Sequence, residues 1–377
     1  MPATSSCLVS NSKGASNYSG EVSPPLELGK NTKIGANHAA RFERFRLQAI
    51  ASQILPIGHR TKSCFQVPRA RKIEGRLTLK AIAYLDGLCL CGKIWACPVC
   101  AHQITARRRL EVIQANKVAR GRGWHVSMLT FTFAHRLGDD FRGNLLGLGE
   151  AHRSLGRHRT YRYIFKAECG AVHSVLATEA THGDINGWHP HHHKLIYSRK
   201  KITEIPDELH RAWSNCCQGA GLRRPDREHG LVLSHDAEAY VAKWGWAEEV
   251  TGQAHKKSET PFSLLARYAD TGDLKCARLY QDYVAATHGV HQLQFSRGAK
   301  ADFGIAQVSD QQASEVPEEE RESSILLRRI NLLEWALVRK FNAIPALFEA
   351  MQERGEPGMS ALFENLKQRN QPAFFAC

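Results

Sequence analysis

The sequence predicts an α+β fold in which an antiparallel sheet carries helices on one face, in the ferredoxin-like or RRM-like arrangement. Three observations predict this fold. Residues 124–250 read in the order β-α-β-β-α-β-α, which is the split βαβ arrangement with one appended helix. The two middle strands are joined as a hairpin that is rich in histidine, and four cysteines at metal-ligand spacing come before the first strand.

We divide the chain into four regions. Residues 1–38 are rich in Ser, Asn, Gly and Pro and show no apolar period, which predicts a disordered tail. Residues 39–120 form an N-terminal region with a zinc knuckle and an arginine-rich helix, and it opens with an amphipathic helix over 39–56. Residues 121–305 form the domain that carries the histidine-rich hairpin, which we expect to be a catalytic domain for the reasons given below. Residues 306–377 form an acidic linker and a C-terminal helical region.

Within the catalytic domain, each element follows from a local pattern. Trp124–Phe133 is β-branched and aromatic, which predicts a buried strand, and a leucine-bearing helix follows over 141–157. Pro206 opens another helix, with acidic residues in its first turn. The remaining expectations are strands over 172–181, 188–197 and 231–233, a helix over 236–250, a long leucine-rich helix over 325–354, and a last short helix over 360–369.

Composition limits the classes of protein. The chain has 377 residues, a formal charge of +14 and a pI near 9.4. Such a charge indicates a polyanionic partner, usually nucleic acid, and the alternative is a basic surface that serves solubility. No apolar run is long enough to span a membrane, and the polar N-terminus is unlike a secretory signal. Eleven cysteines without such a signal favour metal binding in a reducing cytoplasm over disulfides, so we expect a cytoplasmic protein.

The cysteine block LCLCGKIWACPVC places Cys89, Cys91, Cys97 and Cys100 at the spacing C-x-C-x5-C-x2-C. Two close thiol pairs that flank a short loop suit tetrahedral Zn²⁺, so we expect a structural zinc site. The first pair is tighter than the usual two-residue gap. Cys64, His102 or another residue therefore stays open as the fourth ligand. The alternative to zinc is a set of buried free cysteines or a redox pair.

Three arginines, Arg107, Arg108 and Arg109, follow the knuckle on a helix that we expect to reach about Arg120. This position predicts an element that contacts DNA phosphates. The alternative is a solvated helix face.

The hairpin TEATHGDINGWHPHHHKLIY indicates a divalent-metal site. Strand periodicity places His189, His191 and His193 on one face and His192 on the other. If His182 pairs with Trp188, then Glu179 lies opposite His191. A carboxylate beside imidazoles suits Mg²⁺ or Mn²⁺, whereas a site of histidines alone would favour Zn²⁺, Cu²⁺ or Ni²⁺.

The helix expected downstream carries a candidate nucleophile. Asp236, Tyr240 and Lys243 share one of its faces. A phenol has a pKa of about 10 and needs help to attack at neutral pH. The lysine ammonium favours the phenolate, and a metal polarises a phosphodiester. On its own the pattern also fits an ordinary amphipathic helix; the histidine hairpin upstream favours the nucleophile.

Three blocks carry a resemblance to a known family: HVSMLTFTFAH at 125–135, EATHGDINGWHPHHHKLIY at 179–197 and AYVAKWGWAEEVTG at 239–252. They resemble the HUH endonucleases, and more narrowly the replication initiators (Rep proteins) of bacterial rolling-circle plasmids. The cysteine block and GAKADFGI at 298–305 are similar to segments on either side of that core. The resemblance covers roughly residues 85–310.

The resemblance implies a metal-dependent DNA nicking and closing endonuclease that acts on single-stranded or hairpin origin DNA. It makes His191 and His193 metal ligands, Tyr240 the nucleophile that forms a 5′-phosphotyrosine link, and Lys243 its helix partner. It places Asp236 where a carboxylate can activate water. A host helicase is a further expected partner, because an exposed leucine-rich C-terminal helix would allow it to dock.

This sequence departs from the family pattern at His192 and Lys194, which stand where apolar residues are usual. Trp244 stands where two-tyrosine relatives carry a second tyrosine, which predicts a one-tyrosine enzyme. Rival functions also stay open. The rivals are a transposase of the single-strand HUH type and a non-enzymatic zinc-containing DNA-binding regulator. A zinc hydrolase is disfavoured because the H-E-x-x-H pattern does not occur.

Overall fold

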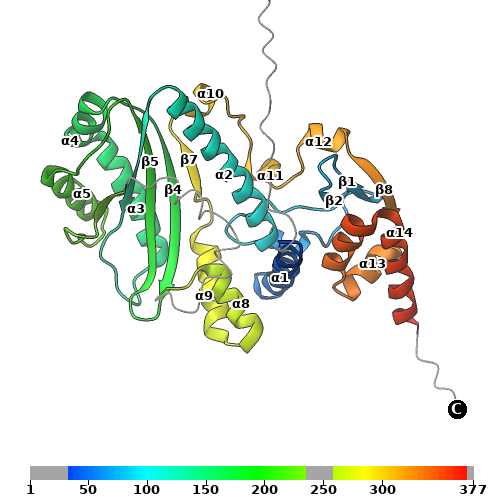
Figure 1. The fold of residues 1–377 in the computed structure, drawn as a ribbon. Helices are drawn as coiled ribbons and strands as arrows, with labels where there is room; N and C mark the ends of the chain where they lie inside the picture. Colours follow the sequence, from blue (N-terminus) through cyan, green and yellow to red (C-terminus); the bar gives the residue numbers. More distant parts are fainter. Residues whose placement is uncertain (1–32, 235–257, 372–377) are drawn as a thin grey trace, which may run out of the picture.

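The computed structural model describes residues 33–234 and 258–371 (Figure 1). Residues 33–38 of the expected tail belong to the first helix, and residues 1–32 lie outside the described part of the chain. The expected helix over 236–250 also falls outside it. In the described ranges, no helix is both long and apolar enough to cross a membrane.

The centre of the molecule is a five-stranded antiparallel sheet in the order β6-β3-β5-β4-β7. Helix α3 (Phe141–Arg157) connects β3 to β4, and α5 (Asp207–Gly219) connects β5 to β6, so the first four strands have the expected ferredoxin-like order. The fifth strand, β7, extends the sheet beside β4. The strand bounds are β3 His125–Phe131, β4 Ala171–Gly183, β5 Gly187–Ser198, β6 Leu231–Ser234 and β7 Leu293–Phe295.

Helices cover both faces of this sheet, so the expectation of one covered face is wrong. Helices α3 and α5 pack on the face that carries Phe131. Helix α2 (Pro98–Gly121) lies over the opposite face, where its Ala115 joins a core with Met128 and Tyr197 (Figure 1). The physical reason is that β3 and β5 present apolar side chains to both sides, and a sheet of that kind must be buried on both.

The hairpin register is the one that the sequence predicts. His182 pairs with Trp188 and Glu179 pairs with His191. Gly187 opens the return strand with a φ of +74°, in the left-handed region that glycine tolerates. The odd-numbered histidines of β5 therefore share one face, and His192 lies on the other.

The N-terminal and C-terminal regions build a second sheet together, in the order β2-β1-β8. Its strands are β1 Ile73–Leu77, β2 Ala83–Asp86 and β8 Ile325–Ile330. The expected helix over 325–354 is therefore wrong at its start. The segment ILLRRI completes the open edge of β1, and Asn331 then caps the next helix through a capping box with Glu334.

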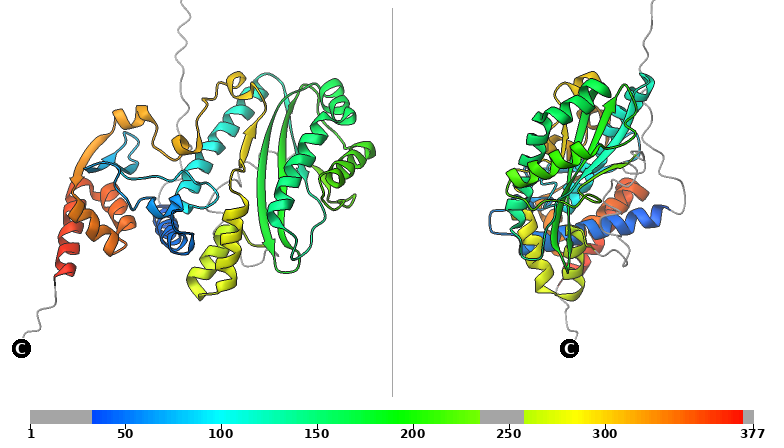
Figure 2. Two further views of the ribbon diagram at one scale, coloured as in Figure 1. Left: turned by 180° about the vertical axis from the view of Figure 1, so that it is seen from behind. Right: turned by 90° about the vertical axis from the view of Figure 1, so that its left-hand side faces the viewer.

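One apolar core joins that small sheet to the helices around it. The principal helices are α1 Lys33–Ile54, α8 Pro261–Thr271, α9 Leu274–Ala286, α13 Leu332–Lys340 and α14 Ile344–Asn370. The expected short helix over 360–369 belongs to α14, in which Gly355 has a φ of +58° and interrupts the helical path. Figure 2 shows the three-stranded sheet and α14 at one end of the molecule and the five-stranded sheet at the other.

Short helical segments complete the described chain. They are η1 Arg60–Ser63, α4 Arg159–Arg162, the π-helical turn Tyr163–Glu168, α10 Ala299–Asp302, α11 Asp310–Ala313 and α12 Glu318–Glu322.

The shared core predicts the effect of a C-terminal substitution on N-terminal stability. Trp335 is 2% exposed, and its Nε1 donates to the carbonyl of Gln66 at 3.2 Å. We expect Trp335→Ala to lower the free energy of unfolding by about 3–5 kcal/mol, measured by urea denaturation. Leu333→Ala on the same helix is the control, since Leu333 is 81% exposed, and its effect should stay within about 0.5 kcal/mol. Equal effects of the two variants would contradict the shared core.

Candidate active site and metal centres

The hairpin brings three predicted ligands together on one sheet face. A carboxylate oxygen of Glu179 and a ring nitrogen each of His191 and His193 all lie within 4.8 Å of one another. The Nε2 atoms of His191 and His193 are 3.4 Å and 3.6 Å from Glu179 Oε2. One carboxylate and two imidazoles can bind a divalent cation and leave several positions for water or a phosphate oxygen.

Hydrogen bonds at the far ring atoms orient both imidazoles. His191 Nδ1 lies 3.2 Å from the carbonyl oxygen of His189, and because a carbonyl only accepts, this nitrogen carries the proton. His193 Nδ1 lies 2.9 Å from the hydroxyl of Thr130 on β3. Both Nε2 atoms face Glu179, which is the orientation that a shared metal ion would require.

The electrostatics of the cluster keep the carboxylate ionised. Burial alone would raise the pKa of Glu179, but hydrogen bonds and charge interactions with His191 and His193 outweigh it and hold that pKa well below its usual range. An anionic oxygen between two imidazoles fits a hard divalent cation better than a set of histidines alone.

His189 borders the cluster of three and is not one of its members. Its ring stacks on His191 with centroids 5.1 Å apart, and its Nδ1 lies 3.2 Å from His135 Nδ1. Burial, followed by the neighbouring histidines, lowers the pKa of His189 to about 3, so it is neutral. The sequence reasoning placed His189 on the correct face and missed both His135 and Thr130. The signal for Thr130 is its strand position opposite His193.

His192 and Lys194, the two polar residues of β5 that depart from the family pattern, contact side chains on the sheet face that α3 covers. The ring of His192 packs edge-on against His152 of α3 at 5.2 Å. Lys194 Nζ donates to His152 Nε2 at 3.1 Å and lies 5.0 Å from the ring centre of Tyr161. Burial lowers the pKa of His152, which keeps the ring neutral and able to accept this bond. The polar back of the strand is thus held by specific contacts.

The candidate nucleophile and its partners, Tyr240, Lys243 and Asp236, lie outside the described residues. The described residues on either side are both attached to the central sheet. Ser234 ends β6 opposite Met128, and Glu259 exchanges two backbone hydrogen bonds of 2.8 Å with His182.

A second group of candidate ligands lies in the N-terminal region. The sulfur atoms of Cys64, Cys91, Cys97 and Cys100 are within 4.8 Å of one another, and all four residues are buried. The Cys64–Cys100 distance is 3.5 Å, and the Cys91–Cys100 and Cys64–Cys97 distances are 3.6 Å. A tetrahedron with Zn–S bonds of about 2.3 Å has sulfur atoms about 3.8 Å apart. The group is therefore of the size that zinc requires.

Cys64, one of the residues left open as the fourth ligand, belongs to the group, and Cys89 does not. The backbone of Cys89 pairs with the earlier segment, donating to Val67 and accepting from Phe65. This pairing brings the neighbouring Cys64 to the knuckle, while Cys89 stays half-buried and outside the group. No local spacing could indicate this, because Cys64 lies far from the other three in sequence. Cys97 and Cys100 sit at the start of α2, as expected.

The arginine run is less available to a partner than the sequence suggested. Arg108 is 8% exposed and is held by Glu111 at 2.7 Å and Asp310 at 2.9 Å. Arg107 and Arg109 are half-buried on the same helix. The charge of Arg108 is thus already paired within the protein, which favours a structural role for this residue, and a DNA contact by the arginine run stays a prediction.

Comparisons with known proteins find two similar proteins of Streptomyces. The chain is 28% identical to "Protein rep" of Streptomyces lividans over 295 residues, which are 58% of this chain and 64% of that protein. It is 30% identical to "Neomycin resistance protein" of Streptomyces cyanogenus over 152 residues, 34% of this chain and 35% of that protein. The matches thus span less than two thirds of either relative. No protein-family model and no solved structure matches the chain.

The cysteine group predicts that zinc binding depends on the thiol of Cys64 and not on that of Cys89. We expect the purified protein to hold about one zinc ion per chain. Cys64→Ser should lose it, whereas Cys89→Ser should retain it, measured by atomic emission on the full-length protein. Zinc loss in Cys89→Ser with retention in Cys64→Ser would restore the ligand set that the sequence alone suggested.

The Thr130 contact predicts the effect of a positioning residue. We expect Thr130→Val to weaken Mn²⁺ binding at the hairpin about 10–100-fold, because His193 loses the bond that orients it. Calorimetric titration with Mn²⁺ measures this. Thr130→Ser should restore the affinity. The control is Thr132→Val. The hydroxyl of Thr132 donates to the carbonyl of His229 and does not contact a candidate ligand. Unchanged Mn²⁺ affinity in Thr130→Val would show that Thr130 does not orient the ligand.

Proposed function

We propose that this protein is a rolling-circle plasmid replication initiator. It acts as an origin-specific endonuclease and ligase on single-stranded or hairpin DNA. The observation that carries the proposal is the Glu179–His191–His193 cluster, in which both Nε2 atoms face an ionised carboxylate on one sheet face. The similarity to "Protein rep" and the charge of +14 support the same reading.

The chemistry that we infer is a transesterification. Tyr240 loses its phenolic proton, and its oxygen attacks the phosphorus of one phosphodiester. The Tyr240–phosphorus bond forms as the bond to the 3′-oxygen breaks, and that oxygen leaves as a 3′-hydroxyl. Because one phosphodiester replaces another, the bond energy is retained, and a later 3′-hydroxyl can reverse the step and rejoin the strand.

Each residue has a separate part in this proposal. Glu179, His191 and His193 hold Mg²⁺ or Mn²⁺, which when bound polarises the scissile phosphate. Lys243 stabilises negative charge beside the phenolate. Asp236 activates water when the link to Tyr240 is finally hydrolysed.

The chain length between β6 and the nucleophile is compatible with this arrangement. Tyr240 comes six residues after Ser234 in the sequence, and six residues can span up to about 20 Å. The cluster lies on β4 and β5, and β3 alone separates β5 from β6. Two strand spacings amount to about 10 Å, so the tether is long enough.

The cysteine group serves structure in this proposal. Zinc there would hold the start of α2 against the η1 turn and the loop after β2, since Cys64 follows η1 and Cys91 follows β2. It would therefore fix the helix that covers the sheet face carrying the cluster.

The nucleophile is tested by trapping a covalent adduct. We expect the protein, incubated with Mn²⁺ and end-labelled single strands tiled across the DNA that carries its gene, to give a labelled band on a denaturing protein gel. Tyr240→Phe should abolish the band. Tyr163→Phe, a change at a tyrosine that is 60% exposed, should keep it. His191→Ala should abolish cleavage and leave DNA binding intact.

Three results would contradict the proposal. An adduct that persists in Tyr240→Phe would move the nucleophile elsewhere. Loss of DNA binding in His191→Ala would make the histidines structural. Binding without an adduct on any strand would favour the non-enzymatic DNA-binding regulator.

A further inference from the structure

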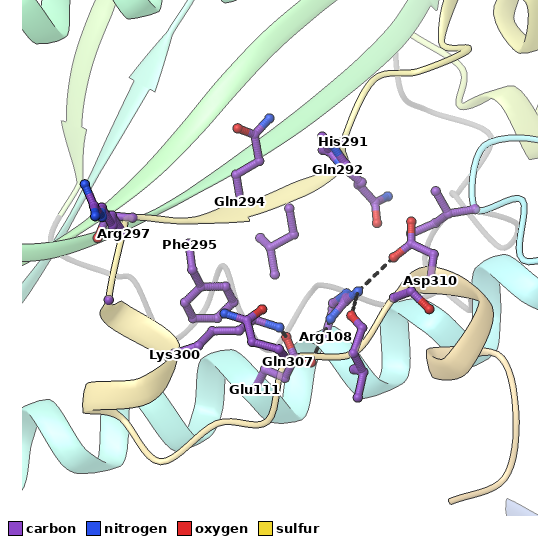
Figure 3. Close-up of a pocket in the computed structure, with 16 residues that line it drawn as sticks. Arg108, Glu111, His291, Gln292, Gln294, Phe295, Arg297, Lys300, Gln307 and Asp310 are labelled. Atoms are coloured by element: carbon purple, nitrogen blue, oxygen red, sulfur yellow. Dashed lines mark hydrogen bonds and ion pairs between the residues drawn. The ribbon is translucent and has the colours of Figure 1, made fainter.

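A cavity of about 610 Å³ lies between β7, α2 and the segment that leads into α11 (Figure 3). This volume is within the range of about 300–1,000 Å³ that is typical of small-molecule sites. Apolar, amide and charged side chains all line it, among them Leu293, Phe295, Gln292 and Arg297. None of these residues has a part in the function proposed above.

The cavity lies on the same face of the sheet as the Glu179–His191–His193 cluster, and next to it. Leu293 lies opposite Ala177, and Phe295 lies opposite Val175, so their side chains share a face with the β4 residues of odd number. Glu179 is two residues beyond Ala177 on that face, about 7 Å along the strand. A polynucleotide bound at Glu179 therefore needs to extend by only one or two nucleotides to reach the cavity.

The charges in the wall are already balanced, which disfavours a phosphate as the occupant. Asp310 pairs with Arg108 at 2.9 Å, Arg108 pairs with Glu111 at 2.7 Å, and Lys300 pairs with Glu111 at 2.8 Å. All but Asp310 are buried. Arg297 also lines the cavity and takes no part in these ion pairs. It is exposed at the edge of the cavity. An anionic group would fit at Arg297 and not in the interior.

The interior instead offers groups that suit a heterocycle. The amide oxygen of Gln292 is buried and has no hydrogen-bond partner among the described residues, so it needs a donor. The ring of Phe295 points toward α2 and lies 5.1 Å from the ammonium of Lys300 (Figure 3). Aromatic rings of this kind stack on nucleobases, and amides bond their edges.

We propose that this cavity binds a nucleobase of the single strand whose phosphate lies at the Glu179–His191–His193 cluster. The inference rests on the proposed function in that single-stranded DNA is the substrate. Phe295 stacks on the base, Gln292 accepts a hydrogen bond from its exocyclic amine or ring N–H, and Arg297 contacts the adjoining phosphate. The cavity is then a specificity site for one nucleotide near the nick.

Photo-crosslinking tests the contact directly and needs no cleavage. The probe is a set of random single-stranded DNA 20-mers that carry one 5-iododeoxyuridine, bound to the full-length protein without added divalent metal. We expect the crosslink on the tryptic peptide of residues 279–297, which contains Gln292 and Phe295. Phe295→Leu should remove it. Phe341→Leu, at another half-buried phenylalanine, should not.

Binding measurements separate base from backbone recognition. We expect Gln292→Leu to weaken binding of the normal 20-mer about tenfold and to leave binding of a fully abasic 20-mer unchanged. The control is Gln218→Leu on α5, which covers the opposite face of the sheet. Equal weakening on both DNAs, or crosslinks confined to other peptides, would overturn the base site.

The two proposals can fail separately. A crosslink on 279–297 without any Tyr240 adduct would refute nicking and leave the base site standing. A Tyr240 adduct with crosslinks only elsewhere would refute the base site and leave nicking standing.

Discussion

The pairing of His182 with Trp188 is the constraint on which the candidate site depends. It places Glu179 opposite His191, and a slip of one residue would turn His191 and His193 toward α3. Trp188 fixes this register from the apolar side, because its ring stacks on Phe141 at 4.7 Å and on Tyr283 at 5.4 Å. The candidate ligands are thus aligned by an aromatic cluster at the end of the hairpin, and none of the three aromatic residues belongs to the Glu179–His191–His193 group.

The cysteine group has a comparable role for helix α2, which covers the sheet face that carries the cluster. Helix α2 begins at the knuckle, and the hydroxyl of Tyr280 on α9 donates to the carbonyl of Ala96 just before it at 2.6 Å. Helix α2 is held at its start and packs on Met128 and Tyr197 further along its length. The cavity beside β7 stays open next to this helix. The helix that begins at the cysteine group therefore covers the sheet face that carries the Glu179–His191–His193 cluster.

Local patterns explain what could be predicted from the sequence. The hairpin register and the faces of His191 and His192 follow from strand periodicity and turn chemistry within one hairpin. The split βαβ order follows from the succession of such local patterns along residues 124–234. The features that were left open or missed depend on contacts between distant segments. Cys64 reaches the knuckle through the Phe65–Cys89 backbone pair, Thr130 meets His193 across two strands, and residues 325–330 become a strand because β1 offers an open edge. The sequence around 325 favours a helix locally, and tertiary pairing overrides it.

The pairing of β1 with β8 also has a consequence for synthesis on the ribosome. Gly75 meets Arg328 only after the whole central sheet has been translated. The central strands β3, β4 and β5 are close neighbours in sequence, so their pairing closes short loops and can proceed early. The N-terminal sheet must instead wait with an open edge until the chain reaches residue 330. Nascent chains therefore expose β1 for most of their elongation, and this edge is where a chaperone or another nascent chain can bind first.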